Sequence, residues 1–179
     1  MDNVRRINRE LKYVGAIVDV YSDTMEFSNE NIEQWDYVAH RKGAAAVVPV
    51  LPDGKILMVK QYRNAINRET LEIPAGARDN VDELTSVCAA RELEEETGYR
   101  CGYLEKLITV ATTVAFCNEV IDIYVATDLV KTERHLDENE FVDVVECELD
   151  ELTKCILEGK IQDGKTVSAL LAYKAKYGL

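Results

Sequence analysis

The feature of the sequence that most constrains its fold is a nearly continuous apolar run at residues 44–51, AAAVVPVL. A strand with one face in water alternates apolar and polar residues, whereas a strand covered on both faces forms an unbroken apolar segment. The run is too short to cross a membrane, because a span needs about 20 apolar residues. Residues 44–51 therefore predict a strand in the interior of a layered domain.

Strand and helix patterns are interleaved along the rest of the chain. The turn signal Pro52-Asp53-Gly54 separates the apolar run from a second strand pattern at 55–62, which predicts a hairpin. A helix beginning at Asp82 or Glu83 is expected to end at Thr97, before Gly98. We expect further strands at 11–21 (one or two strands), 36–41, 70–73, 102–111, 120–127 and 141–147, and further helices at 150–158 and 165–176. The chain has 179 residues and no repeat or linker, which indicates one domain of the α/β type.

The composition excludes several kinds of partner. The formal net charge is −12, so the chain lacks the basic surplus that binds nucleic acids or anionic membrane surfaces. Its five cysteines are odd in number, form no CxxC pair and follow no apolar signal segment, which is typical of reduced thiols in the cytoplasm. Only two histidines are present, which argues against a zinc site built from histidine and cysteine.

The predicted helix that ends at Thr97 has an unusual acidic face. At about 100° per residue, the side of the helix that begins apolar continues into Glu92, Glu95 and Glu96, while Glu94 points away. Negative charge near a helix C-terminus opposes the macrodipole, and each like-charged pair one turn apart costs about 0.2–0.5 kcal/mol. A solvated acidic surface is one interpretation of this face. Its position on the core side favours a second, in which the carboxylates bind a cation.

A divalent cation would turn the repulsion into coordination. Arg91 lies four residues before Glu95, close enough to hold a carboxylate in place. Upstream, Pro74-Ala75-Gly76 ends a strand and leads into a loop whose backbone oxygens could join the same centre. Carboxylates and a backbone carbonyl are the oxygen ligands that suit Mg²⁺ or Mn²⁺. The pattern therefore predicts a Mg²⁺ site, with Mn²⁺ as the alternative, built without histidine.

At these residues the sequence resembles the Nudix hydrolase family, whose box reads G-x5-E-x7-R-E-U-x-E-E-x-G-U with U apolar. Glu83 is followed by seven residues and then by RELEEETGY at 91–99, which matches the box throughout if Tyr99 is the last apolar position. The departure lies upstream, where Gly76 precedes Glu83 by seven positions instead of six. We interpret it as a one-residue insertion at 77–82. The alternative takes Asp82 as the acid, but its spacing to Arg91 is then wrong by one.

The likeness extends to the ADP-ribose pyrophosphatase branch of the family. Segments 43–50, 61–63, 71–76, 118–120 and 137–141 are similar to that branch. The resemblance implies the Nudix fold, an α-β-α sandwich of the α+β class with a mixed sheet between helices. It also implies two parts, an N-terminal strand extension at 1–42 through which such proteins pair as homodimers, and a Nudix domain at 43–179. A proline that the branch usually carries about sixteen residues after the box is missing, since Val114 and Ala115 occupy that neighbourhood.

The resemblance also implies roles for the acidic residues. Glu92 and Glu96 would bind the metal directly, Glu95 directly or through water, and the Ala75 carbonyl would complete the set. Arg91 would hold the glutamates by a salt bridge. The catalytic base that activates water is expected outside the box, in the acidic loop that contains Glu138 and Glu140, and we favour Glu140 because it lies just before the predicted strand.

Substrate-binding residues are expected on other segments. Arg63 would contact a phosphate, for which arginine is better suited than lysine. Glu72 would support the metal cluster or a substrate hydroxyl. Trp35 and Tyr37 are candidates for stacking on a base, and Arg41 is a weaker candidate for phosphate or ribose. For each, a structural role is the alternative: an ion pair for Arg63, core packing for the aromatics and a solvated surface position for Arg41, as for Arg68.

The resulting hypothesis is a metal-dependent hydrolase that cleaves the pyrophosphate of a nucleoside diphosphate linked to a sugar. ADP-ribose, giving AMP and ribose 5-phosphate, is the first candidate substrate. Because the proline is missing, another NDP-sugar such as GDP-mannose, or a dinucleotide, is the alternative. A third hypothesis, a non-catalytic sensor of the same ligands, is disfavoured because such modules tend to lose box acids that are all present here.

Overall fold

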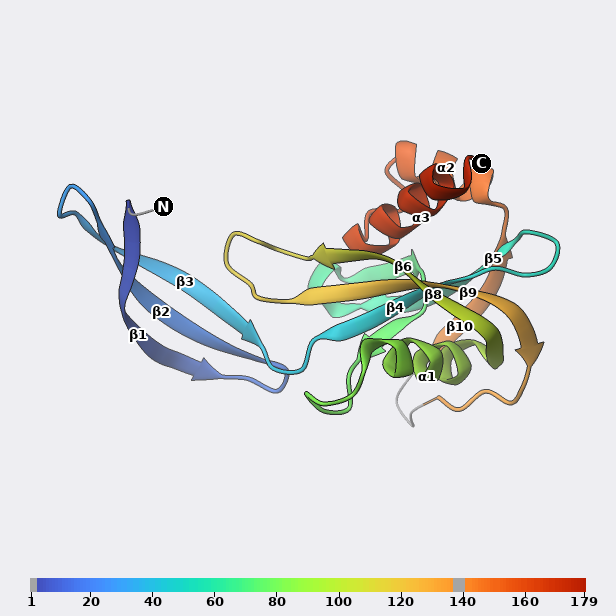
Figure 1. Ribbon diagram of the computed structural model, residues 1–179, viewed down its shortest axis with the longest axis horizontal. Coiled ribbons are helices and arrows are strands. Elements are labelled where there is room, and N and C mark those ends of the chain that lie inside the picture. The colour runs from blue at the N-terminus through green and yellow to red at the C-terminus, as the bar shows by residue number, and fades with distance from the viewer. Residues whose placement is uncertain (1–2, 137–140) are drawn as a thin grey trace.

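The computed structural model describes residues 3–136 and 141–179 and contains two parts, a projecting N-terminal sheet and a larger layered domain (Figure 1). The predicted loop residues Glu138 and Glu140 lie outside the described residues. The projecting sheet is an antiparallel meander of β1 (Val4–Val14), β2 (Val18–Phe27) and β3 (Ile32–His40). The sequence pattern marked only parts of these strands. Segment 11–21 forms two strands, because the chain reverses where the Gly15 amide donates to the Val18 carbonyl at 2.9 Å.

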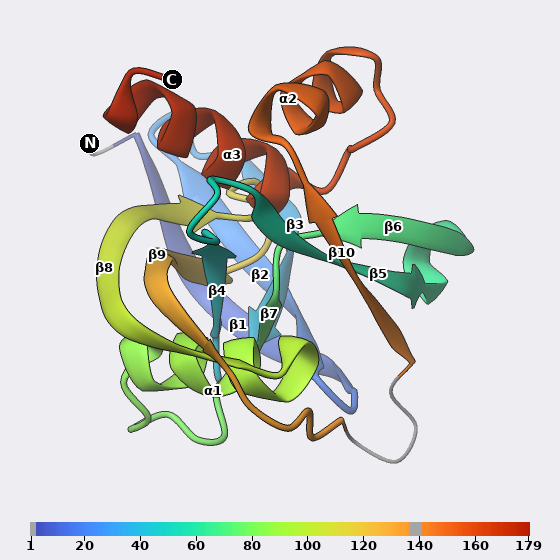
Figure 2. The same cartoon turned by 90° about the vertical axis from the view of Figure 1, so that its right-hand side faces the viewer.

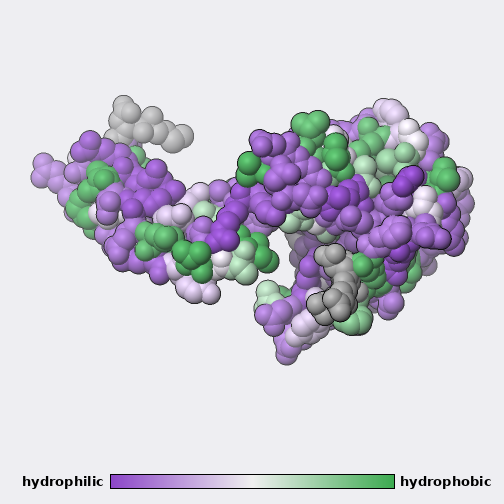
Figure 3. All heavy atoms as spheres, turned by 90° about the horizontal axis from the view of Figure 1, so that it is seen from below, coloured by the Kyte–Doolittle hydropathy of each residue, from purple (hydrophilic) through white to green (hydrophobic). Residues whose placement is uncertain are grey.

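Among the residues that the structure describes, no helix packs on the N-terminal sheet (Figure 1), and hydrophobic patches lie on the surface of this part of the molecule (Figure 3). Its exposed apolar residues are Val4, Ile7, Leu11, Tyr13, Val14, Ile32 and Trp35. The sheet meets the larger domain near the end of β3, where the Val38 amide donates to the Phe116 carbonyl at 2.7 Å and the His40 amide donates to Asn118 Oδ1 at 2.7 Å.

The larger domain contains two sheets. In the first, with the order β7-β4-β9-β8, β4 (Ala44–Pro49) pairs in parallel with β9 (Val120–Lys131) and antiparallel with β7 (Ala75–Ala77). The outer strand β8 (Tyr99–Ala111) pairs antiparallel with β9, so this sheet is mixed, as predicted. The second sheet has the order β10-β5-β6 and is antiparallel, with β10 (Val142–Cys147), β5 (Ile56–Arg63) and β6 (Arg68–Glu72). The short 3-10 helix η1 (Asn64–Ile66) joins β5 to β6.

The predicted interior strand is β4. Its alternate residues Ala45 and Val47 face a cluster that includes Cys88, Ala89 and Leu93 of α1 (Thr85–Thr97). The intervening residues Ala46 and Val48 face the opposite cluster, which contains residues of α2 (Leu149–Leu157) and α3 (Gly164–Tyr177). All four side chains on β4 are fully buried. The sheet therefore lies between α1 on one face and α3 on the other (Figure 2), which confirms the sandwich.

The predicted hairpin between 44–51 and 55–62 is wrong. The two strands belong to different sheets, and the contact between them is a single bridge between Val50 and Ile56. Both edges of β4 are already paired, with β7 on one side and β9 on the other, so β5 cannot pair with it. The turn at 52–54 instead directs β5 into the second sheet, where it pairs with β10 and β6.

The first helix begins later than predicted. Asn80 Oδ1 accepts hydrogen bonds from the amides of Asp82 at 2.9 Å and Glu83 at 3.0 Å, which folds these residues into a turn. Leu84 is still extended, and α1 begins at Thr85. The helix ends at Thr97 with Gly98 in the left-handed conformation, as the sequence predicts. Within the described part of the chain, we find no helix with the length and apolar character needed to span a membrane.

Candidate functional site

The acidic residues of α1 are divided between its two sides. Glu96 is 1% exposed and Glu92 is 9% exposed, and both line a cavity together with Glu95. Glu94 does not line this cavity, and its carboxylate pairs with Arg100 Nε at 2.7 Å. The helical spacing therefore predicts the arrangement correctly, with three carboxylates beside the β7 loop and one on the other side.

One guanidinium organises this acidic face. Arg91 Nη1 donates to Glu92 Oε1 at 2.7 Å and to Glu95 Oε2 at 2.8 Å. Its other edge pairs with Glu83, whose Oε1 lies 3.2 Å from Nε and whose Oε2 lies 3.3 Å from Nη2, and Nη2 also donates to the Ala77 carbonyl at 3.0 Å. The hydrogen bonds from Arg91 hold the pKa of Glu83 below its usual range. The salt-bridge role predicted for Arg91 thus has a geometric basis.

Strand β7, which follows β6, approaches the acidic face closely. The Ala75 amide donates to Glu96 Oε2 at 3.0 Å. A Cβ added to Gly76 would lie 2.2 Å from the Glu92 carboxyl carbon, so a side chain at this position would displace the Glu92 carboxylate. The cavity between β7 and α1 has a volume of about 320 Å³. It is bordered by Gln61, Arg63, Ala75–Ala77, Asp79, Arg91, Glu92, Glu95, Glu96 and His135.

The donor chemistry of this cavity suits a hard divalent cation. Carboxylate oxygens line it on one side and the backbone of Ala75–Ala77 on the other, and oxygen donors are the ligands that Mg²⁺ and Mn²⁺ prefer. Within residues 3–136 and 141–179, no three acidic, histidine or cysteine side chains already form a coordinating cluster. In the structure the carboxylates are held instead by Arg91 and by the Ala75 amide.

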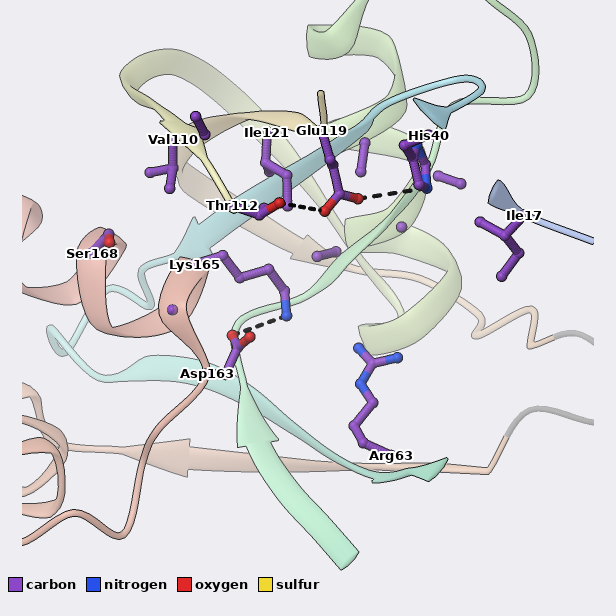
Figure 4. Close-up of a pocket in the computed structure, with 16 residues that line it drawn as sticks. Ile17, His40, Arg63, Val110, Thr112, Glu119, Ile121, Asp163, Lys165 and Ser168 are labelled. Carbon is purple, nitrogen blue, oxygen red and sulfur yellow. Dashed lines mark hydrogen bonds and ion pairs between the residues drawn. The ribbon is translucent and has the colours of Figure 1, made fainter. Parts of the chain in front are cut away.

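A second and larger cavity, of about 560 Å³, adjoins the first (Figure 4). The two share Arg63 and the backbone of Ala75–Ala77. Arg63 and Lys165 reach into the larger cavity from β5 and α3, while His40, Thr112 and Glu119 line its other side (Figure 4). A molecule that fills both cavities would therefore contact carboxylates and cations within one continuous site.

The two cations are fixed by one buried carboxylate. Arg63 Nε and Nη2 donate to Glu72 at 2.8 Å and 2.7 Å, Lys165 Nζ also bonds Glu72, and Thr70 Oγ1 donates to it at 2.6 Å. Burial opposes ionisation of Glu72, but the hydrogen bonds from Arg63 and the charge of Lys165 outweigh it and lower the pKa to about 2. Glu72 therefore holds the cations rather than facing solvent, since it is 1% exposed.

The opposite wall carries a carboxylate whose partners are also fixed. The Gly43 amide donates to His40 Nδ1 at 3.0 Å, which leaves the proton of a neutral His40 on Nε2, 3.5 Å from Glu119 Oε1. Thr112 Oγ1 donates to Glu119 Oε2 at 2.8 Å.

The sequence alone did not indicate Lys165, His40, Thr112 or Glu119 as site residues. The only signal for one of them was the likeness of segment 118–120 to the ADP-ribose pyrophosphatase branch.

Besides Glu72, which lines neither cavity but holds Arg63 and Lys165, three of the predicted substrate-binding residues lie outside both cavities. Trp35 is on β3, with its ring against Phe27 at 5.9 Å between centroids, and Tyr37 on the same strand stacks under the Arg9 guanidinium at 3.7 Å. Arg41 is bound to Asp19 and to the carbonyls of Ala16 and Gly15, the latter at 2.7 Å. The folded chain thus does not bring these three to the cavities, and their binding roles stay predictions.

The described residues beside segment 137–140 lie close to the end of α1. Arg134 Nε donates to the Glu96 carbonyl at 2.6 Å, and Arg134 Nη2 bonds the Val142 carbonyl. The His135 amide donates to the Glu95 carbonyl at 3.3 Å, and His135 borders the carboxylate cavity. The positive charge of Arg134 also interacts favourably with the negative end of the α1 dipole.

The low pKa of Glu72 predicts an acid-sensitive contribution to stability. Because its pKa is about 2 in the folded protein and about 4.3 in an unfolded chain, Glu72 contributes about 3 kcal/mol above pH 5, and this is lost as the pH falls toward 2. Urea unfolding from pH 7 to pH 3 should show a steeper loss for the wild type than for Glu72→Gln. Glu146→Gln, at an exposed carboxylate on β10, is the matched control. Parallel curves for Glu72→Gln and the wild type would contradict the assignment.

Comparisons with known proteins agree with this architecture. The chain is 42% identical over 168 residues to a methanol dehydrogenase activator of Bacillus methanolicus, covering 93% of this chain and 90% of that protein. It is 36% identical over 177 residues to an ADP-ribose pyrophosphatase of Bacillus subtilis (strain 168), covering 98% and 95%. It is 30% identical over 167 residues to a GDP-mannose pyrophosphatase of Yersinia enterocolitica, covering 88% and 86%.

A solved structure and a family model complete the comparison. The crystal structure of an ADP compounds hydrolase matches with a TM-score of 0.87 at 23% identity, covering 97% of this chain and 93% of that one, which confirms the predicted fold. The model of the NUDIX domain matches residues 40–170, which include α1 and every residue that lines the carboxylate cavity. The chain therefore belongs to the NUDIX domain family.

Proposed function

We propose that the chain is a divalent-metal-dependent hydrolase that cleaves the pyrophosphate bond of nucleoside diphosphate sugars. The observation that carries the proposal is the junction of a carboxylate cavity with a larger cavity that contains Arg63 and Lys165. ADP-ribose is the first candidate substrate, giving AMP and ribose 5-phosphate, and it is the substrate named for the 36% identical relative from Bacillus subtilis. GDP-mannose, named for a relative at 30% identity, is the alternative.

The carboxylates of α1 fit the metal-binding part of this role. We assign Glu92, Glu95, Glu96 and the Ala75 carbonyl as ligands of Mg²⁺, or of Mn²⁺, as the box resemblance implies. Bound there, the metal would neutralise the charge of the pyrophosphate and lower the pKa of a water ligand. Arg91 holds Glu92 and Glu95 at one edge of its guanidinium, so these carboxylates keep their orientation before any ligand arrives.

The cations of the larger cavity fit the phosphate-binding part. Arg63 and Lys165 are both held by Glu72, and Lys165 Nζ also bonds Asp163 at 2.9 Å. Because the side chains are already ordered, they bind a diphosphate without a large loss of conformational entropy. Glu72 thus supports substrate binding indirectly, by positioning Arg63 and Lys165, and would not itself face the phosphates.

Turnover with a substrate panel tests the proposed function. Incubation of the protein with Mg²⁺ and ADP-ribose, GDP-mannose, UDP-glucose or NADH should release a nucleoside monophosphate from at least one of them, identified by mass spectrometry. ADP-ribose should be cleaved fastest. Glu96→Gln is the control, expected to lower turnover at least tenfold because it removes a metal ligand while keeping the shape of the side chain. If none of the four substrates is cleaved, the enzyme assignment fails and a ligand-sensing role is favoured.

The catalytic base is proposed to be Glu140, which lies outside the described residues. Support comes from its neighbours, since His135 borders the carboxylate cavity and the Val142 carbonyl is bonded by Arg134. Single-turnover measurements should show that Glu140→Gln slows chemistry much more than Glu138→Gln, by about 10²–10⁴-fold, because it removes general-base catalysis. The reverse ranking would assign the base to Glu138.

We further propose that residues 1–42 form a dimerisation extension and that the protein acts in the cytoplasm. The exposed apolar residues of the N-terminal sheet support pairing with a second copy. All five cysteines are free thiols and each lies in the described part of the chain, which supports a reducing compartment. Light scattering should give twice the chain mass of 20.2 kDa. Ile7→Asp, on the exposed face of β1, should lower that mass toward the monomer, and a monomeric wild type would refute the dimer.

A further inference from the structure

The loop between β7 and α1 contains the one-residue departure from the family box. Asp79 to Glu83 fold back on themselves: the Asp79 amide donates to Glu83 Oε2 at 2.7 Å, and Asn80 Oδ1 accepts from the Glu83 amide at 3.0 Å. These bonds return the Glu83 carboxylate to the site despite the extra residue. They do not attach the loop to the body of the domain.

Arg91 of α1 makes one attachment, through Glu83 at 3.2 Å and Asp79 at 3.7 Å, and Arg78 makes a second, to the segment before β4. Arg78 Nε donates to the Glu83 carbonyl at 2.7 Å and its Nη2 bonds the Val81 carbonyl, so the guanidinium closes the loop from the inside. Its Nη1 donates to the Lys42 carbonyl at 3.2 Å, and the Arg78 amide donates to the Gly43 carbonyl at 3.1 Å. A planar fork of donors can serve three carbonyls in fixed directions, whereas a lysine ammonium cannot reproduce that geometry.

A continuous chain of contacts runs from Arg78 to the carboxylates. Arg78 fixes the backbone of Glu83, the Glu83 carboxylate pairs with one edge of Arg91, and the other edge of Arg91 holds Glu92 and Glu95. The Glu83 side chain is only 9% exposed, so the pair is shielded from water. A displaced Glu83 would leave Arg91 free to turn toward the remaining carboxylates of the cavity.

We propose that Arg78 is a positioning residue for the metal-binding carboxylates of α1, acting through Glu83 and Arg91. It compensates for the inserted residue by fixing the lengthened loop to the carbonyls of Lys42 and Gly43. The inference rests on the proposed function only in taking Glu92, Glu95 and Glu96 as metal ligands. Arg78 borders neither cavity and does not touch a reacting group.

Binding of Mn²⁺ to the full-length protein, followed by electron paramagnetic resonance without substrate, tests the proposal. Arg78→Lys keeps the positive charge but removes the planar guanidinium that bonds three carbonyls. It should raise the Mn²⁺ dissociation constant about tenfold, in the range found when groups that orient metal ligands are changed. Arg100→Lys is the matched control, because Arg100 pairs with Glu94 on the other side of the same helix, and it should change the constant less than twofold.

A double-mutant cycle tests the route through Glu83. Glu83→Gln alone should also weaken Mn²⁺ binding, and the Arg78→Lys/Glu83→Gln variant should be little weaker than the worse single variant, because both changes act on the same contact. Additive losses, an unchanged constant in Arg78→Lys, or an equal loss in Arg100→Lys would overturn the proposal. A wild type that binds Mn²⁺ but cleaves no substrate would refute the proposed function alone, whereas a wild type that binds no Mn²⁺ would refute both.

Discussion

The pairing of Arg91 with three glutamates is the interaction on which the rest of the site depends. Glu92 and Glu96 are nearly buried at the C-terminal end of a helix, where the macrodipole already disfavours negative charge. Removing such carboxylates from water costs several kcal/mol each unless a counter-charge or hydrogen bond is close. Arg91, the Ala75 amide and Arg134 supply these partners, the last at the Glu96 carbonyl. The acidic face is thus stable enough to exist before a cation binds, and a bound cation would add to partners that are already present.

The buried strand β4 determines where this face lies. Both faces of β4 are apolar, so α1 packs on one of them. One edge of β4 pairs with all of β7. These two constraints bring the backbone of Ala75–Ala77 against Glu92 and Glu96, and the Glu92 carboxylate occupies the space that a side chain at Gly76 would take. The same sheet carries β9, whose preceding residue Glu119 lines the larger cavity. Packing in the core and the shape of the site are therefore consequences of one strand.

Local patterns predicted the central elements well and the distant contacts poorly. The two-sided burial of β4, the carboxylate arrangement on α1 and the Arg91 salt bridge all follow from spacing within a few residues, and each is present. The prediction of a hairpin after β4 was wrong because both edges of β4 pair with strands that are far away in sequence, β7 and β9. Lys165 was missed for a similar reason: its helical spacing is ordinary, and only the folded chain brings the first turn of α3 beside Glu72 at the end of β6. No pattern in a single chain indicates which distant lysine will face a buried carboxylate.

The junction between the two parts of the molecule lies beside the larger cavity. His40 is the last residue of β3 in the N-terminal sheet, yet it forms part of the wall of the larger cavity and lies 3.5 Å from Glu119. The sheet is joined to the domain by backbone hydrogen bonds of Val38 with Phe116 and Asn118, and by the His40 amide, which donates to Asn118 Oδ1. Ile17, in the turn between β1 and β2, lines the same cavity (Figure 4). A molecule bound in the larger cavity would therefore contact both parts of the chain at once.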